Sequence, residues 1–138
     1  MLSPAEFINL YAQVGAKKSS NSAQRLYLSA VLAGFLIGAG AVVANTAGHM
    51  LTNAGLSRVL CGLLFPFGLI MVIITGAELF TGNCLITISL LEKRASLAGM
   101  VRNLVIVYIG NLLGALVLAA AIVYCGQLDL SGGALAVH

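Results

Sequence analysis

Tryptophan is absent from this sequence, and charged side chains make up only 8% of its 138 residues. A soluble domain carries about 25% charged residues, so this scarcity excludes an ordinary soluble fold. Hydrophobic residues account for 60% of the chain, and glycine is abundant, which suits close packing of helices in lipid. The composition therefore predicts an all-α integral membrane protein whose surroundings are a lipid bilayer, and we expect no nucleic-acid partner.

Cysteine and histidine are also few. Cys61, Cys84 and Cys125 all fall in or beside apolar runs, and an odd number of such cysteines argues against a disulfide framework. The sequence has no metal-ligand cluster, no nucleophile next to a base and no phosphate-binding glycine loop. We therefore expect no metal, no cofactor and no enzymatic activity.

Three long apolar runs are present, at about residues 26–47, 60–91 and 103–124. The second run has 32 residues and would be about 48 Å long as a straight helix, whereas a bilayer core is about 30 Å thick. Glycine and polar residues interrupt it near 76–83, in the order Gly-Ala-Glu-Leu-Phe-Thr-Gly-Asn. This pattern predicts a broken membrane helix, which places helix ends and bare backbone inside the bilayer to handle a solute.

The segments outside the runs predict how the chain is arranged. Residues 1–25 are predicted to form an amphipathic helix and a linker, with Ser3, Pro4 and Glu6 forming its start. Six of the seven basic residues lie before the first run or between the second and third runs. The excess of basic residues on one side predicts a cytoplasmic N-terminus in a multi-pass protein of the inner (plasma) membrane. Residues 127–138 then form an outer loop.

Four polar or glycine residues at the break, Gly76, Glu78, Gly82 and Asn83, are predicted to shape it. The break is expected to free N–H groups at the start of a following half-helix over about 82–91, where they would favour an anion. Glu78 is the only carboxylate in the run and has two possible roles, as a ligand or as an acceptor for loop N–H groups or a helix cap. The structural role is favoured because a carboxylate repels anions. The Thr81 hydroxyl could face an anion or bond back to its own helix.

The sequence at the break resembles the hallmark segment of the formate/nitrite transporter family. The stretch Arg-Asn-Leu at 102–104, with Val-Tyr-Ile-Gly-Asn-Leu at 107–112, resembles that family's third helix. The resemblance implies an aquaporin-like inverted-repeat bundle of six helices and assembly into a homopentamer. It also implies a pore in each protomer for a small monovalent anion such as formate, nitrite or hydrosulfide, and leaves open whether a proton crosses with it.

The resemblance further implies roles for five residues. Phe65 and Leu69 match an outer apolar constriction, and Leu79 and Phe80 match an inner one. Thr81 matches a threonine that faces a central histidine in the second half of the family's chain. Neither His49 nor His138 falls where that histidine is expected.

Three spans are an odd number, as expected for one half of an inverted repeat, so we expect this chain to be the first half of a six-span protein, with 26–126 as its three-span repeat. Two alternatives stay open from the sequence. An aquaporin-like channel for neutral solutes would share the fold, but its two Asn-Pro-Ala boxes are missing, since the only prolines are Pro4 and Pro66. A non-transporting membrane scaffold would explain the glycines but not the polar break.

Overall fold

The computed structural model describes residues 3–133 and 135, and all its regular elements are helices. Their order is α1 (Pro4–Ser19), α2 (Ala23–Gly48), α3 (Ala54–Leu64), α4 (Pro66–Thr75), α5 (Phe80–Asn83), α6 (Ile86–Leu91) and α7 (Leu97–Tyr124), followed by the 3-10 helix η1 (Gln127–Gly133). Three segments are long and apolar enough to cross a membrane: α2, the joined α3 and α4, and α7. The predicted all-helical fold with three spans is confirmed.

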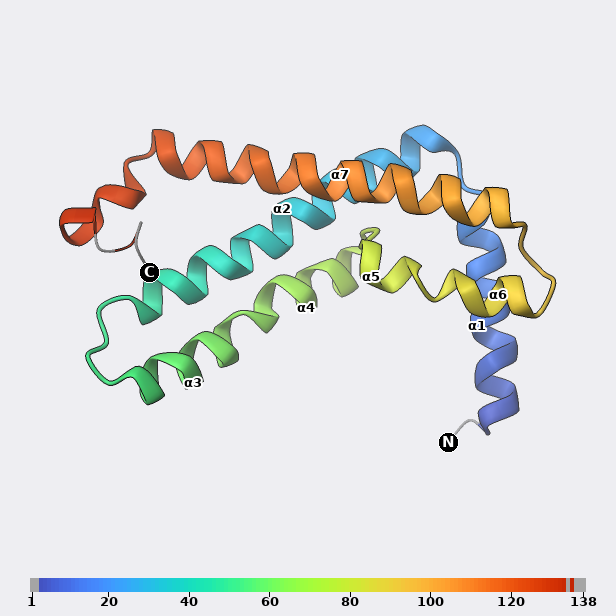
Figure 1. Ribbon diagram of the computed structural model, residues 1–138, viewed down its shortest axis with the longest axis horizontal. Coiled ribbons are helices and arrows are strands. Elements are labelled where there is room, and N and C mark those ends of the chain that lie inside the picture. Colours follow the sequence, from blue (N-terminus) through green and yellow to red (C-terminus); the bar gives the residue numbers. More distant parts are fainter. Residues whose placement is uncertain (1–2, 134, 136–138) are drawn as a thin grey trace.

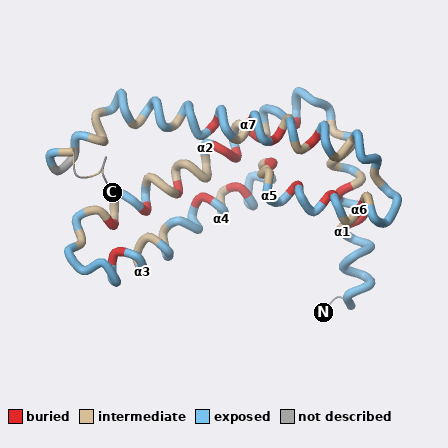
Figure 2. The backbone as a smooth tube through the Cα atoms, viewed as in Figure 1, coloured by how far each residue is buried: buried red, intermediate tan, exposed pale blue. Residues whose placement is uncertain are grey.

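The helices form an elongated bundle (Figure 1). Helices α2 and α7 pack along each other, and the second span, from α3 to α6, runs on one side of α2. Helix α1 crosses the end of this arrangement and packs on α6. Buried residues line the surfaces where the helices meet, and the outer faces are exposed (Figure 2).

Helices α2 and α7 touch backbone to backbone because glycines face each other's main chain. A Cβ atom on Gly34 would overlap the carbonyl oxygen of Asn111, and one on Gly114 would overlap that of Val31. In lipid, where water does not drive helices together, such close approach supplies much of the attraction. Leu26, Ala30 and Val107 form a buried cluster between the two helices.

The second span starts earlier than the apolar run suggested. Helix α3 begins at Ala54 rather than near residue 60, because the Asn53 side chain accepts hydrogen bonds from the N–H groups of Gly55 and Leu56 and so caps the helix. Residues 54–59, which lie before the predicted run, are therefore helical. At Pro66 the span is divided into α3 and α4, since proline has no N–H to continue the helix.

The other span boundaries also differ by a few residues. Helix α7 begins at Leu97, six residues before the predicted start, because the Ser96 hydroxyl accepts from the Gly99 N–H. Part of the predicted outer loop 127–138 is η1, and residues 134 and 136–138, His138 included, lie outside the described residues.

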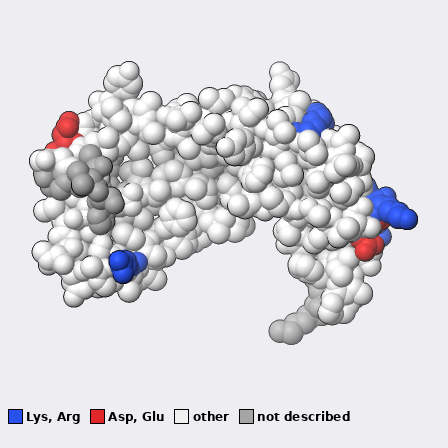
Figure 3. All heavy atoms as spheres, in the orientation of Figure 1, with Lys and Arg blue, Asp and Glu red and all other residues white. Residues whose placement is uncertain are grey.

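On the face drawn in Figure 3, charged side chains lie at the ends of the bundle. In the view of Figure 3, basic atoms gather where α1 meets the start of α7, another basic group lies at the far end near α3, and the surface between them is uncharged. The exposed side chains along the spans are large and apolar, for example Leu63, Ile73 and Ile74. This surface suits burial in lipid or against further helices.

Candidate functional site

The second span breaks directly after Thr75. Gly76 adopts a left-handed conformation with φ 63°, which glycine reaches without a steric penalty. Its N–H donates to the carbonyl of Ile73, and the N–H of Ala77 donates to that of Val72, so the last turn of α4 is closed in the manner of a Schellman motif. The chain then runs without regular structure until α5 begins at Phe80.

Side chains of α2 and α7 hold the open segment in place. The N–H of Glu78 donates to Ser29 Oγ at 3.1 Å, and the N–H of Phe80 donates to Asn111 Oδ1 at 2.9 Å. The same Asn111 amide donates from Nδ2 to the carbonyls of Glu78, at 3.0 Å, and Ala30, at 2.7 Å. The N–H and carbonyl of Glu78 and the N–H of Phe80, which the break would leave unpaired in a low-dielectric interior, are thus satisfied by neighbouring helices.

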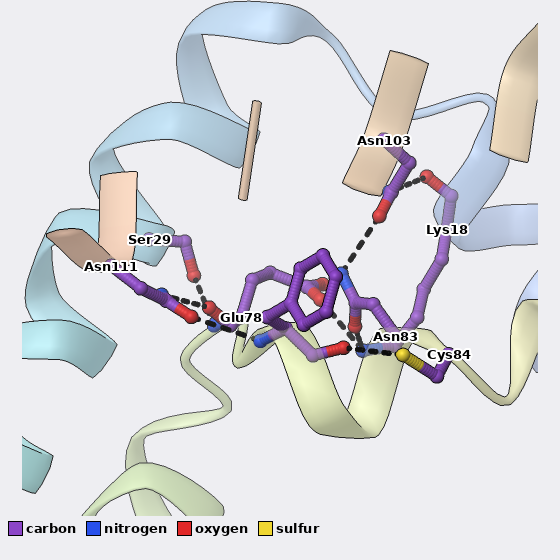
Figure 4. Close-up of polar contacts among 8 residues, drawn as sticks. Lys18, Ser29, Glu78, Asn83, Cys84, Asn103 and Asn111 are labelled. Carbon is purple, nitrogen blue, oxygen red and sulfur yellow. Dashed lines mark hydrogen bonds and ion pairs between the residues drawn. The ribbon is translucent and has the colours of Figure 1, made fainter. Parts of the chain in front are cut away.

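A closed ring of hydrogen bonds joins Lys18, Asn83 and Asn103 beside the break, and Glu78 is bonded to it through Lys18 (Figure 4). Lys18 Nζ, at the end of α1, donates to Glu78 Oε2 at 2.6 Å and to Asn83 Oδ1 at 2.8 Å. Asn83 Nδ2 donates to Asn103 Oδ1 at 2.8 Å, and Asn103 Nδ2 donates to the carbonyl of Lys18 at 2.9 Å. Both asparagines are no more than 1% exposed. Three elements that are distant in sequence therefore meet in one hydrogen-bonded network.

The carboxylate of Glu78 has a different partner from the two that the sequence suggested. It neither accepts from the loop N–H groups nor caps the following helix; its described partner is the Lys18 ammonium. Sequence reasoning missed Lys18 because it lies 60 residues away, in the N-terminal segment 1–25 that was predicted to stand outside the spans. One signal could have found it: a lone carboxylate in an apolar span needs a cation, and Lys18 precedes the first span closely.

The helix after the break also differs from the expected continuous half-helix over 82–91. Helix α5 has only four residues, and a turn at Cys84 and Leu85 separates it from α6. Its first N–H is already bonded to Asn111. A helix this short has little macrodipole, so the positive charge at the break comes from Lys18 instead.

A pocket of about 360 Å³ opens at the break. Its walls come from α4, the open segment and α5, and Lys18 and Glu78 are part of them. We call it the break pocket. Of the five predicted pore residues, Leu69, Leu79 and Thr81 line it, whereas Phe65 and Phe80 do not.

The two phenylalanines lie elsewhere. Phe80 packs on the buried cluster between α2 and α7, and its ring meets the ring of Tyr108 edge-on with centroids 5.7 Å apart. Phe65 stands at the junction of α3 and α4, where its side chain is largely exposed. Adjacent residues Leu79 and Phe80 thus point to different surroundings.

Thr81 differs from the other threonines of the second span. Thr75 Oγ1 donates to the Met71 carbonyl at 2.8 Å, and Thr87 Oγ1 donates to the Cys84 carbonyl at 2.7 Å. The Thr81 hydroxyl has no such bond within the part of the chain that the structure describes, and it is exposed at the break pocket. Its hydrogen-bonding capacity is free for a solute or another side chain.

The described residues contain no group of three or more His, Cys, Asp or Glu side chains that could hold a metal ion. The break pocket therefore offers a hydroxyl, an ammonium paired with one carboxylate, and apolar walls. Such a set can bind a small polar or anionic solute.

Comparisons with known proteins agree on one family. The family model described as formate/nitrite transporter matches residues 5–137. The chain is 34% identical over 122 residues to a probable formate transporter of Methanothermobacter thermautotrophicus, covering 85% of this chain and 44% of that protein. It is 32% identical over 134 residues to the formate channel FocA of Haemophilus influenzae, covering 96% of this chain and 47% of that protein.

A solved structure described as an FNT family ion channel matches with a TM-score of 0.80 at 28% identity, covering 86% of this chain and 49% of that one. The chain spans about half the length of the curated relatives it matches.

Proposed function

The chain belongs to the formate/nitrite transporter family, a family of multi-pass membrane transporters and channels rather than enzymes, and on that premise we propose that it forms half of a pore for small monovalent anions. The other half of the pore is a second set of three spans in inverted orientation. Formate, nitrite and hydrosulfide are the substrates proposed, and their conjugate acids are small enough to cross as neutral molecules with a proton.

The observation that carries this proposal is the break pocket. An anion in a hydrocarbon environment needs compensation for its lost hydration, because an isolated buried charge costs many kcal/mol. The pocket offers an unused Thr81 hydroxyl and the Lys18 ammonium. An ammonium has three N–H donors, and Lys18 uses two of them on Glu78 and Asn83, so one can meet an anion.

Apolar residues on either side of this polar pocket are proposed to exclude hydrated ions by dewetting. Leu79 forms the inner constriction, with Phe80 buttressing it from the α2–α7 side. Leu69 and Phe65, one turn apart across the start of α4, form the outer constriction. Gly76, Gly82, Glu78 and Asn83 shape the break between the two.

Orientation and assembly are part of the proposal. Six of seven basic residues flank the ends of the spans where α1 and the start of α7 lie, which supports a cytoplasmic N-terminus in the inner membrane. The pentamer is proposed from family membership. In each protomer a histidine of the second half is expected to face Thr81.

Anion flux into proteoliposomes tests the function. Thr81→Val removes the hydroxyl and keeps the side-chain shape, so we expect formate and nitrite flux to fall by about tenfold, the value of one lost hydrogen bond to a charged solute. Thr81→Ser should retain flux. Thr87→Val is the matched control, since the Thr87 hydroxyl already donates to the Cys84 carbonyl in the turn before α6.

Each possible result has a defined meaning. Equal flux in the wild type and Thr81→Val would remove Thr81 from the pore. Wild-type flux of glycerol without flux of formate, nitrite or hydrosulfide would overturn the anion channel in favour of a neutral-solute channel. No flux of any of the four solutes would favour a scaffold.

A further inference from the structure

Asn103 is buried in α7 and is not among the residues that line the break pocket, yet it joins two of them. Its oxygen accepts from the Asn83 amide, and its nitrogen donates to the main-chain carbonyl of Lys18. In the sequence, Asn103 belongs to the stretch 102–104 that resembles the family's third helix, and no role in the pore was predicted for its side chain. Asn103 can therefore act on the break pocket through Asn83 and Lys18.

The hydrogen bonds of the ring can run in only one direction, from donor to acceptor. An ammonium donates and cannot accept, so Asn83 must present its oxygen to Lys18 and its NH2 group elsewhere. Asn103 supplies the acceptor for that NH2 group, and its own NH2 group then faces the Lys18 carbonyl. In this arrangement each hydrogen bond of the ring joins a donor to an acceptor, and the side-chain N and O atoms buried in the described residues all have partners.

Loss of the Asn103 side chain would remove two hydrogen bonds, one to the Asn83 amide and one to the Lys18 carbonyl. The Asn83 amide would lose the acceptor that fixes its direction, and its rotation would turn an NH2 group toward the ammonium. The main chain at Lys18 would lose its tie to α7. The Lys18 side chain is partly exposed, with a relative exposure of 29%, so it has room to leave the pocket wall.

We infer that Asn103 is a positioning residue of the pore: it fixes the direction of the Asn83 amide and the main chain of Lys18, so that the ammonium stays at the break pocket with one N–H free for an anion. This inference rests on the proposed function. It extends that function by assigning a residue outside the pocket to the placement of the pocket's cation.

The test compares three variants in formate flux: Asn103→Leu, Lys18→Met and the two together. We expect each single substitution to lower flux at subsaturating formate by about tenfold, the fold-change that corresponds to losing one hydrogen bond to a charged group. The double variant should be no worse than Lys18→Met, because Asn103 acts through Lys18. A residue with a merely structural role would instead lower flux again in the Lys18→Met protein, and that result would overturn the inference.

Asn103→Asp gives a second test that does not depend on the leucine variant folding. A protonated aspartic acid can accept from Asn83 and donate to the Lys18 carbonyl, whereas its carboxylate cannot donate. The ratio of variant to wild-type flux should therefore fall as pH rises and the introduced carboxyl group loses its proton, on the order of tenfold if the ring is lost. The other charged groups around Lys18 and Asn103 are Lys17 on α1, Arg25 on α2, Glu78 at the break and Arg102 on α7, and both proteins share them.

The outcomes separate this inference from the proposed function. A wild-type protein without anion flux would overturn the proposed function. Wild-type flux combined with unchanged flux in Asn103→Leu, or with a pH-independent ratio in Asn103→Asp, would leave the function standing and overturn the role of Asn103.

Discussion

Helices α2 and α7 and the broken second span lie side by side, yet different forces hold them. The α2–α7 contact rests mainly on close packing, because Gly34 and Gly114 let the two main chains meet, and one side-chain hydrogen bond from Asn111 to the Ala30 carbonyl also joins the helices. The break is held by hydrogen bonds and one ion pair, with Ser29 and Asn111 reaching across from α2 and α7. Helices α2 and α7 thus form a frame, and hydrogen bonds from Ser29 and Asn111 attach the open segment to it.

The difference has a physical cause. Two unbroken helices satisfy their own backbone groups, so they need only close packing to associate in lipid. A segment without regular structure cannot do so and must borrow partners from its neighbours. The close approach of α2 and α7 therefore depends on glycines that carry no side chain, whereas the break depends on particular polar side chains. Substitutions should therefore destabilise the two regions by different mechanisms: overpacking between α2 and α7, and unpaired polar groups at the break.

The largest effect is expected from adding a side chain to the frame. Gly34→Val places its Cβ atom on the backbone of Asn111, which cannot move aside as a flexible side chain could. We expect destabilisation of about 3 kcal/mol or more, at the upper end for overpacking, together with loss of the folded protein in detergent. Gly62→Ala is the control, because nothing lies within 4 Å of its Cβ position. An unchanged unfolding temperature in Gly34→Val would contradict the backbone contact.

A smaller effect is expected at the ion pair. Glu78→Gln leaves the Lys18 ammonium without its counter-charge, and Lys18→Met leaves the Glu78 carboxylate unpaired. Each should lower the free energy of unfolding by about 1–3 kcal/mol, the cost of an unsatisfied buried charged partner. The double variant should lose less than the sum of the two, as measured by chemical denaturation in detergent. Additive losses would show that the 2.6 Å contact does not hold the break.

The sequence predicted the three spans and the existence of the break, but neither which spans pack together nor what holds the break. The spans follow from the apolar runs, and the break follows from glycine and polar residues inside one of them. The helix caps at Asn53 and Ser96 lengthened two spans beyond the runs because capping is a local hydrogen-bond effect that hydropathy does not reveal. The Lys18–Glu78 pair is a tertiary contact over 60 residues, and no local pattern specifies it.

The directions of neighbouring side chains were also beyond sequence reasoning. Leu79 and Phe80 are adjacent apolar residues, and only the fold turns Leu79 to the break pocket and Phe80 to the α2–α7 cluster. Residues in extended backbone alternate sides, whereas residues in a helix do not, and the change between the two falls at this point.

The smallest effect is expected at the start of α1, which connects to the break only through its other end. The Ser3 backbone N–H donates to the Glu6 carboxylate at 2.7 Å, and this bond, with a further contribution from the Ser3 side chain, lowers the pKa of Glu6 below its ordinary value of 4.5. A lowered pKa stabilises the folded state above pH 4.5, and that contribution is lost as pH falls through the folded-state pKa. Acid should therefore increase hydrogen exchange in the first turn of α1.

Glu6→Gln separates this local effect from the break. Glutamine can still complete the capping box but does not titrate, so the acid-dependent increase in exchange should disappear in this variant. Because Lys18 lies at the opposite end of α1, anion flux at neutral pH should equal that of the wild type. Lowered flux at neutral pH would mean that the whole of α1, and not only the residues that meet α6 and the break, positions the ammonium. The set of residues that hold the break through polar contacts would then include the start of α1, whereas the α2–α7 contact would still depend on its glycines alone for close approach.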